Sequence, residues 1–238
     1  MGSGLDLKGG DVNDRMGFVK KVYLILFAQL AITFAWTFIC ITSTSMASWM
    51  IDNWWMYLIT VIVAVVVQLM LICKRDLARK VPVNYICLLI FTICESYFVG
   101  WLCQYYTYDP YYNSFNSEGY RTVGMAAGFT LAITAGLTAY AWTTKADFTR
   151  KMGFMWVLGM TFFMLCIFSI FFYSYVLQMF LCALGVLIFG LYLVIDTQLI
   201  LGEGRHKLSI DDYILGAMIL YVDIIMIFVY LLQLLGGR

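Results

Sequence analysis

The sequence has few charged residues. Asp, Glu, Lys and Arg make up only 12% of its 238 residues, whereas apolar residues make up 63%. Soluble domains carry about 25% charged residues, and a globule of this length cannot hide so much apolar surface. The scarcity of charge therefore excludes a soluble domain and predicts a polytopic membrane protein. The basic residues form no stripe suited to nucleic acid, so we expect no nucleic-acid partner.

Metal-binding motifs are also missing. The sequence has a single histidine, His206, and its seven cysteines form neither a CxxC pair nor a Cys/His cluster. All seven cysteines lie within or at the ends of apolar segments. We interpret them as small apolar packing residues, in preference to metal ligands or a disulfide framework.

Apolar runs of about 20 residues mark helical membrane spans. The longest uncharged stretch, Met152 to Ile195, is roughly twice the length of one span, so we divide it at Tyr173–Tyr175. The prediction is an all-α polytopic fold with a cytosolic N-terminal tail over 1–21 and a transmembrane domain over 22–238. Its seven spans are predicted at about 22–43, 54–73, 82–103, 122–144, 153–173, 176–200 and 213–235.

The distribution of basic residues predicts the orientation. With the N-terminus in the cytosol, thirteen of the fifteen lysines and arginines fall in cytosolic segments, and only Arg121 and Arg238 do not. Such a bias is typical of correctly counted spans. A re-entrant final hairpin is the alternative, and it would return the C-terminus to the cytosol.

Three acidic residues interrupt the apolar spans: Glu95, Asp196 and Asp223. A carboxylate in hydrocarbon is costly, so each is a candidate functional residue. Asp196 and Asp223 occupy the last two spans, which are sequential and antiparallel, and we expect their side chains to approach each other. Two carboxyl groups in a low-dielectric site do not both ionise cheaply, so such a pair would hold a proton near neutral pH. The alternative is that each aspartate separately caps backbone or tethers a neighbouring polar group.

Other features have two interpretations each. Glu95 either lines a cation path or is a protonated acid hydrogen-bonded to a neighbouring helix. Lys74 and Arg75 end the second span as a positive-inside anchor, and one of them could pair with the aspartates. The tyrosine-rich loop Gln104–Arg121 is interpreted as an interfacial aromatic belt, with a lumenal recognition loop as the alternative. Gly124 and Gly128 form a GxxxG motif, which predicts tight intramolecular helix packing.

Several motifs point to a known family of membrane proteins. The segment from Tyr192 to Gly202 and the stretches 211–214 and 220–228 resemble the sixth- and seventh-helix signatures of the Bax-inhibitor/Lifeguard family. Two further matches are Phe91–Ser96 and Ala141–Thr149, and the Glu95-Ser96 pair points to the Lifeguard branch. The resemblance covers nearly the whole chain beyond the short N-terminal segment.

The resemblance implies a seven-helix fold whose last helix is central and enclosed by the other six. It further implies a pH-sensitive calcium leak in the endoplasmic reticulum or Golgi with an anti-apoptotic role, calcium being the permeant ion. Asp196 and Asp223 would be the pH sensor and gate, binding calcium transiently, with Lys74 or Arg75 as a basic partner. No cofactor and no enzymatic activity are expected. The expected partners are the lipid bilayer and membrane proteins that regulate apoptosis.

Two other functions are compatible with paired intramembrane aspartates. A proton-coupled cation exchanger differs from a leak only in its stoichiometric coupling. An intramembrane aspartyl protease also places aspartates on adjacent helices, but presenilin-like enzymes carry a GxGD motif at the second one. Here the residues are Leu220-Tyr221-Val222-Asp223, without the glycines that let a substrate backbone approach.

Overall fold

The computed structural model describes residues 3–172, 174–202 and 204–237, so Tyr173 of the predicted turn and Arg238 lie outside the described residues. Within these described residues, seven helices are long and apolar enough to cross a membrane, which confirms the predicted all-α polytopic class and the number of spans. These helices are α1 (Ser3–Thr42), α3 (Trp55–Cys73), α5 (Val83–Thr107), α6 (Ser117–Thr143), α7 (Met152–Phe171), α8 (Tyr175–Leu201) and α9 (Tyr213–Gly236). Shorter elements connect them: α2 (Thr44–Asp52), α4 (Arg75–Arg79), β1 (Tyr108–Asp109), β2 (Ser114–Phe115) and the 3₁₀ helix η1 (Phe148–Lys151).

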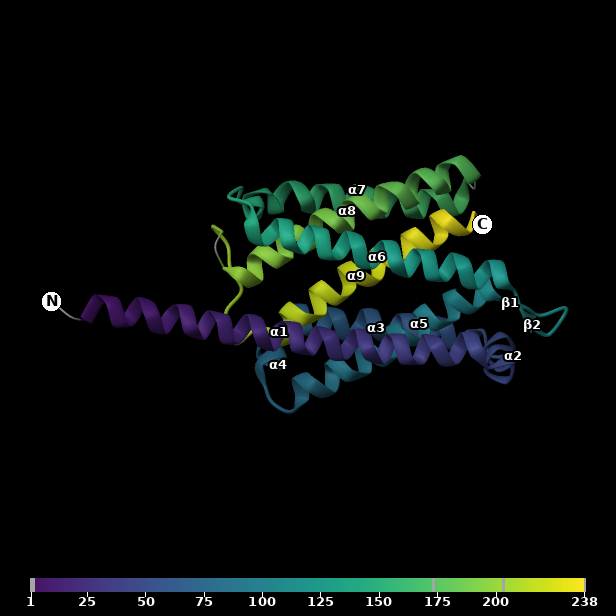
Figure 1. The fold of residues 1–238 in the computed structure, drawn as a ribbon, viewed down its shortest axis with the longest axis horizontal. Coiled ribbons are helices and arrows are strands. Elements are labelled where there is room, and N and C mark those ends of the chain that lie inside the picture. Colours follow the sequence, from purple (N-terminus) through teal and green to yellow (C-terminus); the bar gives the residue numbers. More distant parts are fainter. Residues whose placement is uncertain (1–2, 173, 203, 238) are drawn as a thin grey trace.

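The last helix has the most interior position. α9 crosses the bundle diagonally, and the two ends of the chain lie at opposite ends of the molecule (Figure 1). Of the most apolar part of α9, 67% is buried, against 56% for α5, the next most buried span. α9 packs against α1, α5, α6 and α8, while α3 packs on α5 and α7 on α8, one layer further out. A central α9 agrees with these contacts, and its enclosure by all six other helices stays a prediction.

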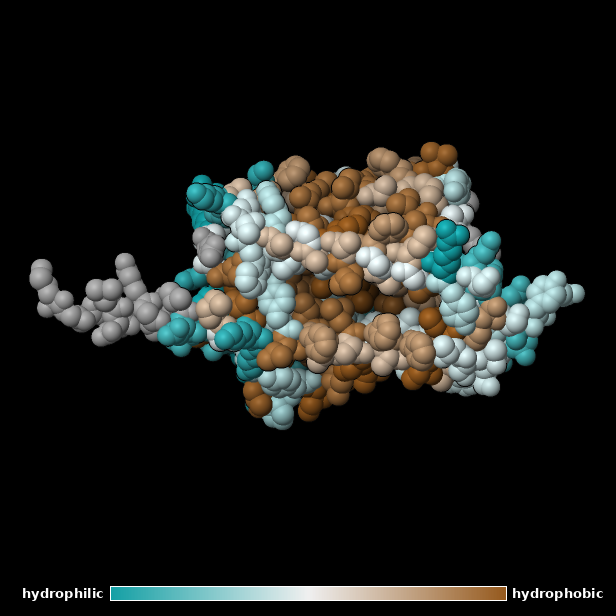
Figure 2. Space-filling view, viewed as in Figure 1, coloured by the Kyte–Doolittle hydropathy of each residue, from teal (hydrophilic) through white to brown (hydrophobic). Residues whose placement is uncertain are grey.

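The outer surface of the bundle is apolar. Large side chains such as Phe27, Leu131 and Phe171 are 71%, 72% and 76% exposed. Figure 2 shows hydrophobic residues along the middle of this face and hydrophilic ones toward its two ends. Apolar side chains exposed in a band between polar ends are what a bilayer requires. The lipid bilayer is therefore the surrounding that this surface fits.

The segment between α5 and α6 is more ordered than the predicted loop Gln104–Arg121. α5 continues to Thr107, β1 and β2 form a two-stranded antiparallel hairpin, and α6 begins at Ser117. Gly119 allows the start of α6 to lie against the end of α5, because a Cβ there would clash with the Tyr106 carbonyl and lie 2.7 Å from Thr107 Cα. The sequence pattern missed this contact because loop composition does not reveal which backbones touch.

The GxxxG motif does not pack as predicted. A Cβ added at Gly124 or Gly128 would meet nothing within 4 Å, so the prediction of tight intramolecular packing at this motif is wrong. Close helix approaches occur instead at isolated glycines. A Cβ at Gly100 would lie 2.9 Å from Cys40 Sγ of α1, and one at Gly185 would lie 2.7 Å from the Tyr230 ring of α9. The small residues on α6 therefore have a different role, which the groove described below explains.

Candidate functional site

The two aspartates of the last spans lie at the packed interface of α8 and α9. Asp223 is only 4% exposed, and Asp196 is partly buried on α8. Their carboxyl groups are neighbours across this interface. Tyr192, one turn before Asp196, lies in the electrostatic range of both carboxyl groups, and its own hydroxyl donates to the Met155 carbonyl at 2.7 Å. The two side chains are neighbours in the structure, and their action as a pair, as sensor and as gate stays a prediction.

Among the described residues, no basic side chain forms an ion pair with Asp196 or Asp223. Within the described residues the ion pairs are Arg79–Asp212 and Arg150–Asp147, and both lie outside the site. The Oδ2 atom of Asp223 is buried and accepts no hydrogen bond from the described residues. An isolated buried carboxylate is strongly disfavoured, so the pair needs a shared proton or a bound cation to be stable.

The end of α8 that follows Asp196 is fixed by contacts to other segments. Arg15 of α1 donates to the carbonyl oxygens of Leu199 (2.6 Å), Leu201 (3.2 Å) and Leu208 (2.6 Å). The last carbonyls of a helix have no partners within the helix and carry partial negative charge, so a guanidinium is well suited to this position. Gln198 binds the segment before α7, accepting from Phe148 N at 2.9 Å and donating to the Ala146 carbonyl at 2.8 Å. These contacts hold the backbone that positions Asp196.

The start of α9 is held by a buried ion pair. Asp212, which is 1% exposed and directly precedes α9, accepts two hydrogen bonds from Arg79, at 2.7 and 3.1 Å. Lys74 and Arg75, the basic partners expected from the sequence, are exposed and lie by the short helix α4 instead of at the aspartate pair. The structure thus brings Arg79, four residues beyond Arg75, to the N-terminus of α9.

Glu95 belongs to a different part of the interior. It is partly buried on α5, and its carboxyl group lies near Tyr57 of α3 and Tyr221 of α9. Beside it, five buried polar residues join α1, α5 and α9 by hydrogen bonds: Gln29, Thr33, Thr92, Ser96 and Tyr221. Thr33 Oγ1 is 2.8 Å from Tyr221 Oη and 3.0 Å from Ser96 Oγ, and Gln29 Nε2 donates to Thr92 Oγ1 at 2.9 Å. The structure does not join Glu95 to the aspartate pair, and its place in a cation path stays a prediction.

One further carboxylate, Asp147, connects two loops at the same end of the bundle. Hydrogen bonds from the Thr149 side chain, together with those from Arg205 N and Arg150, lower the pKa of Asp147 to about 2. Asp147 is therefore ionised throughout the neutral range and cannot sense pH changes there.

The number of nearby ligands bears on how this site could bind a cation. Among the described residues, no three His, Cys, Asp or Glu side chains gather where they could hold a metal ion. Calcium takes six to eight oxygen ligands, and two carboxyl groups supply at most four. A cation held by Asp196 and Asp223 alone would keep several of its waters, and transient calcium binding by this pair stays a prediction.

Comparison with known proteins identifies the family. A family model described as "Inhibitor of apoptosis-promoting Bax1" matches residues 15–238. This chain belongs to the Bax inhibitor family. Protein lifeguard 3 of Homo sapiens is 35% identical over 228 residues, covering 94% of this chain and 70% of that protein, and its Mus musculus counterpart is 34% identical with the same coverage. Bax inhibitor 1 of Schizosaccharomyces pombe is 30% identical over 225 residues, covering 93% of this chain and 77% of that protein.

Membership in the Bax inhibitor family confirms the resemblance seen in the sequence motifs. It identifies the chain as a multi-pass membrane protein of an anti-apoptotic family. Arg15, Gln198 and Arg79 were not recognised as site residues from the sequence. Arg15 and Arg79 were assigned only to the general excess of positive charge at the cytosolic face, and nothing in that pattern shows which carbonyl or carboxylate a given arginine will reach.

Proposed function

We propose that this member of the Bax inhibitor family is a calcium leak channel of intracellular membranes in which Asp196 and Asp223 form a pH-dependent gate. The observation that supports it is a buried carboxyl pair between α8 and α9 without a basic partner among the described residues. The proposal includes a cytosolic N-terminus, a location in the endoplasmic reticulum or Golgi, and a non-enzymatic role that protects cells from apoptosis. The names of its relatives, Bax inhibitor 1 and protein lifeguard 3, agree with such a role.

The state of the gate depends on whether the aspartate pair holds a proton. With one proton on the pair, a hydrogen bond joins the two carboxyl groups and holds α8 against α9. With both groups ionised, two like charges about 4 Å apart repel by about 4 kcal/mol at an effective dielectric constant near 20. That energy either separates the helices or is offset by an entering cation. Calcium flux through the protein therefore rises as the pH increases through the titration of the pair.

The test is calcium uptake by liposomes that contain the purified protein and an enclosed calcium-sensitive dye, measured from about pH 6 to about pH 8, where such a carboxyl pair exchanges its shared proton. We expect wild-type flux to rise with pH. In Asp196→Asn and Asp223→Asn we expect flux that no longer depends on pH, because an amide keeps a hydrogen bond to the remaining carboxylate without titrating. Asp52→Asn, which alters an exposed aspartate at the end of α2, is the matched control and should behave as wild type.

Two results would contradict the proposal. Liposomes with protein that take up no more calcium than empty ones would refute the leak. Variants that keep the wild-type pH dependence would refute the gate. A pH-sensitive dye in the same liposomes distinguishes a leak from a proton-coupled exchanger. If protons move in a fixed ratio opposite to calcium, and still do so when the membrane potential is clamped, the protein is an exchanger and not a leak channel.

A further inference from the structure

A groove runs along the membrane-facing surface between α1 and α6. Along this groove, both helices pack on α9, which forms the floor. Two adjoining cavities of about 540 and 490 Å³ lie between them and share the lining residues Leu131, Thr134 and Ile224. They form one continuous depression, the α1–α6 groove, whose apolar floor is visible between the two helices in Figure 2.

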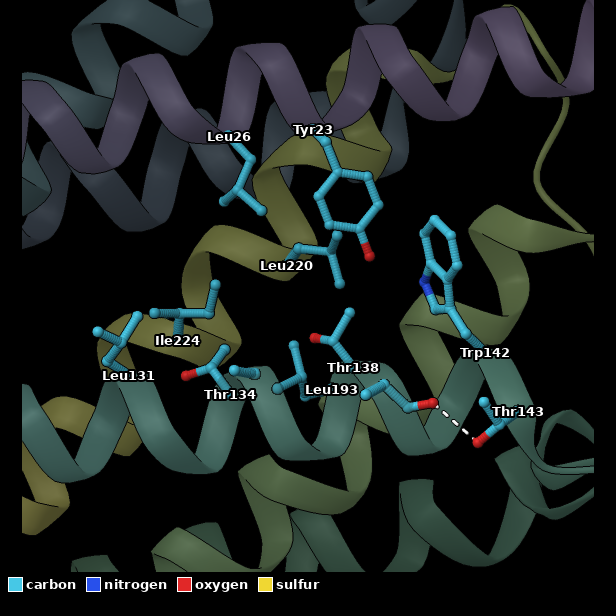
Figure 3. A pocket seen from close by; sticks show the side chains of 12 residues that line it. Tyr23, Leu26, Leu131, Thr134, Thr138, Trp142, Thr143, Leu193, Leu220 and Ile224 are labelled. Atoms are coloured by element: carbon cyan, nitrogen blue, oxygen red, sulfur yellow. Dashed lines mark hydrogen bonds between the residues drawn. The ribbon is translucent and has the colours of Figure 1, made fainter.

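The groove is bounded at both ends by aromatic side chains that join α1 to α6. At one end Tyr23 of α1 meets Trp142 of α6 edge to face, with ring centroids 6.3 Å apart (Figure 3). At the other end the Tyr120 hydroxyl of α6 donates to the Ile41 carbonyl of α1 at 2.5 Å. Between these two contacts the groove is open toward the bilayer. A molecule that fills the groove therefore enters from the hydrocarbon layer.

The lining is apolar although it includes threonines. Thr130 and Thr134 donate their hydroxyl hydrogens to backbone carbonyls of α6 itself, those of Ala126 and Thr130. Hydroxyl groups that bond back to their own helix leave the methyl groups to face outward. Small residues on α6, among them Gly124, Ala127 and Ala135, leave the space between the helices unfilled. Of the GxxxG motif that the sequence pattern assigns to helix packing, Gly124 thus lines the groove.

The size of the groove selects its occupant. A helix with its side chains is about 10–12 Å across, so one that followed the groove over the roughly 27 Å from Tyr23 to Ile41 would fill about 2,100–3,100 Å³. The two cavities, of about 540 and 490 Å³, together offer much less. A single extended hydrocarbon chain is much thinner and can follow the groove from one aromatic boundary to the other. Because the groove opens to the bilayer, acyl chains are the molecules present at its side in high concentration.

The charge at one end of the groove selects the headgroup. Lys20 lies one turn before Tyr23 on α1, and Lys145 lies just beyond the end of α6, three residues after Trp142. Both residues are exposed, and in the described part of the chain no carboxylate forms an ion pair with either. Lysines at the level of the headgroups attract anionic lipids.

We propose that the α1–α6 groove is a lipid-binding site that holds one acyl chain of an anionic phospholipid, with the headgroup against Lys20 and Lys145. The site is independent of the aspartate gate. It touches the interior at Thr33, which lines the groove and also hydrogen-bonds to Tyr221 on α9. A bound acyl chain would therefore lie against Thr33 and shield the Thr33–Tyr221 hydrogen bond from the bilayer on the side that faces the groove.

The test uses photocrosslinking in nanodiscs. The probe is phosphatidylserine with a diazirine in its acyl chain, compared with phosphatidylcholine that carries the same label, and crosslinked peptides are mapped by mass spectrometry. We expect labelling of α6 around Leu131–Ala139 and of α9 around Ile224–Phe228. Phosphatidylserine should be preferred by about tenfold or more, since each lysine near an anionic headgroup contributes roughly fivefold in affinity.

Two pairs of variants make the test specific. Ala135→Phe fills the groove and should lose most of the groove labelling, whereas Ala132→Phe, on the exposed side of α6 outside the groove, should keep it. Lys20→Gln combined with Lys145→Gln leaves the groove open and should abolish the preference for phosphatidylserine, and Lys80→Gln, an exposed lysine after α4, should not. The lysine variants decide the question even if Ala135→Phe fails to fold.

Three outcomes would overturn the proposal. Labelling spread evenly over all lipid-facing helices, and unchanged in Ala135→Phe, would mean that the groove holds no preferred lipid. Equal labelling by the two lipids would refute the headgroup assignment. Crosslinks between α6 helices of two protein molecules, in place of lipid adducts, would assign the groove to a second copy of the chain.

Discussion

The three hydrogen bonds of Arg15 allow a quantitative prediction for Arg15→Ala. The guanidinium binds the carbonyls of Leu199, Leu201 and Leu208 at 2.6–3.2 Å and thereby caps α8. Hydrogen bonds to a charged group contribute about 1.5–3 kcal/mol each, but carbonyls at a partly buried helix end can regain water. We therefore expect a total loss of about 2–4 kcal/mol, well below the sum of three full bonds.

Thermal unfolding in detergent measures this loss. For a chain of this length, 2–4 kcal/mol corresponds to a decrease in midpoint temperature of about 5–15 °C. Arg15→Lys should fall between wild type and Arg15→Ala, because an ammonium group lacks the planar fork that reaches three carbonyls at once. Arg121→Ala, which removes an exposed arginine in the first turns of α6, is the matched control and should change the midpoint little.

The same variant has a local consequence that hydrogen exchange can detect. Without Arg15, amides in the last turn of α8 should exchange faster, while those of α3, which does not pack on α8, should not change. Equal midpoints for Arg15→Ala and Arg121→Ala, together with unchanged exchange in α8, would refute the interpretation of Arg15 as a cap.

Three other contacts give predictions of known direction. Arg79→Gln should lower the thermal unfolding midpoint more than Asp212→Asn does. The reason is that Arg79→Gln leaves a buried carboxylate unpaired, whereas Asp212→Asn leaves only an exposed arginine unpaired. The reverse order would contradict the burial of Asp212. Gly119→Ala should cost about 1–3 kcal/mol because its Cβ collides with backbone, whereas Gly128→Ala should be neutral or slightly stabilising, and equal unfolding midpoints would refute the close approach. The pKa of Asp147 is about 2 in the folded protein, below its ordinary value of 3.8. Asp147 therefore contributes its full stabilisation at pH values above 3.8, and this stabilisation is lost as the pH falls toward 2. Asp147→Asn should therefore weaken the protection of the Arg205 amide at neutral pH and leave the pH dependence of calcium flux unchanged; a shifted flux profile would move the sensor to this loop.

The sequence predicts the architecture well because the bilayer imposes a simple rule. Uncharged runs of sufficient length predict seven membrane-length helices, the number found among the described residues, and the antiparallel order of the last two spans predicts that Asp196 and Asp223 lie at one interface. The same rule does not predict which residues of different spans are in contact. The spacing of Gly124 and Gly128 matches a helix-packing motif, yet no atom lies within 4 Å of a Cβ added at either residue. How far apart α1 and α6 lie depends on how both helices pack on α9, which the spacing does not show.

Charged residues show a similar limit. The excess of lysine and arginine at one face predicts orientation, and in that pattern Arg15, Arg75 and Arg79 are equivalent. Only the structure separates them: Arg15 caps α8, Arg79 pairs with Asp212, and Arg75 is exposed. Such differences depend on side-chain reach across helices far apart in the sequence, which neither composition nor periodicity records.

The central claim is that Asp196 and Asp223 share one proton near neutral pH. Infrared difference spectroscopy of the protein in lipid, from about pH 6 to about pH 8, measures the protonated carboxyl group directly. We predict a carboxylic acid signal that disappears as the pH rises, with the same midpoint as the increase in calcium flux, and that is reduced in both Asp196→Asn and Asp223→Asn while any share from Glu95 remains. A signal that persists unchanged in either variant, or wild-type protein without any protonated carboxyl group in this range, would contradict it.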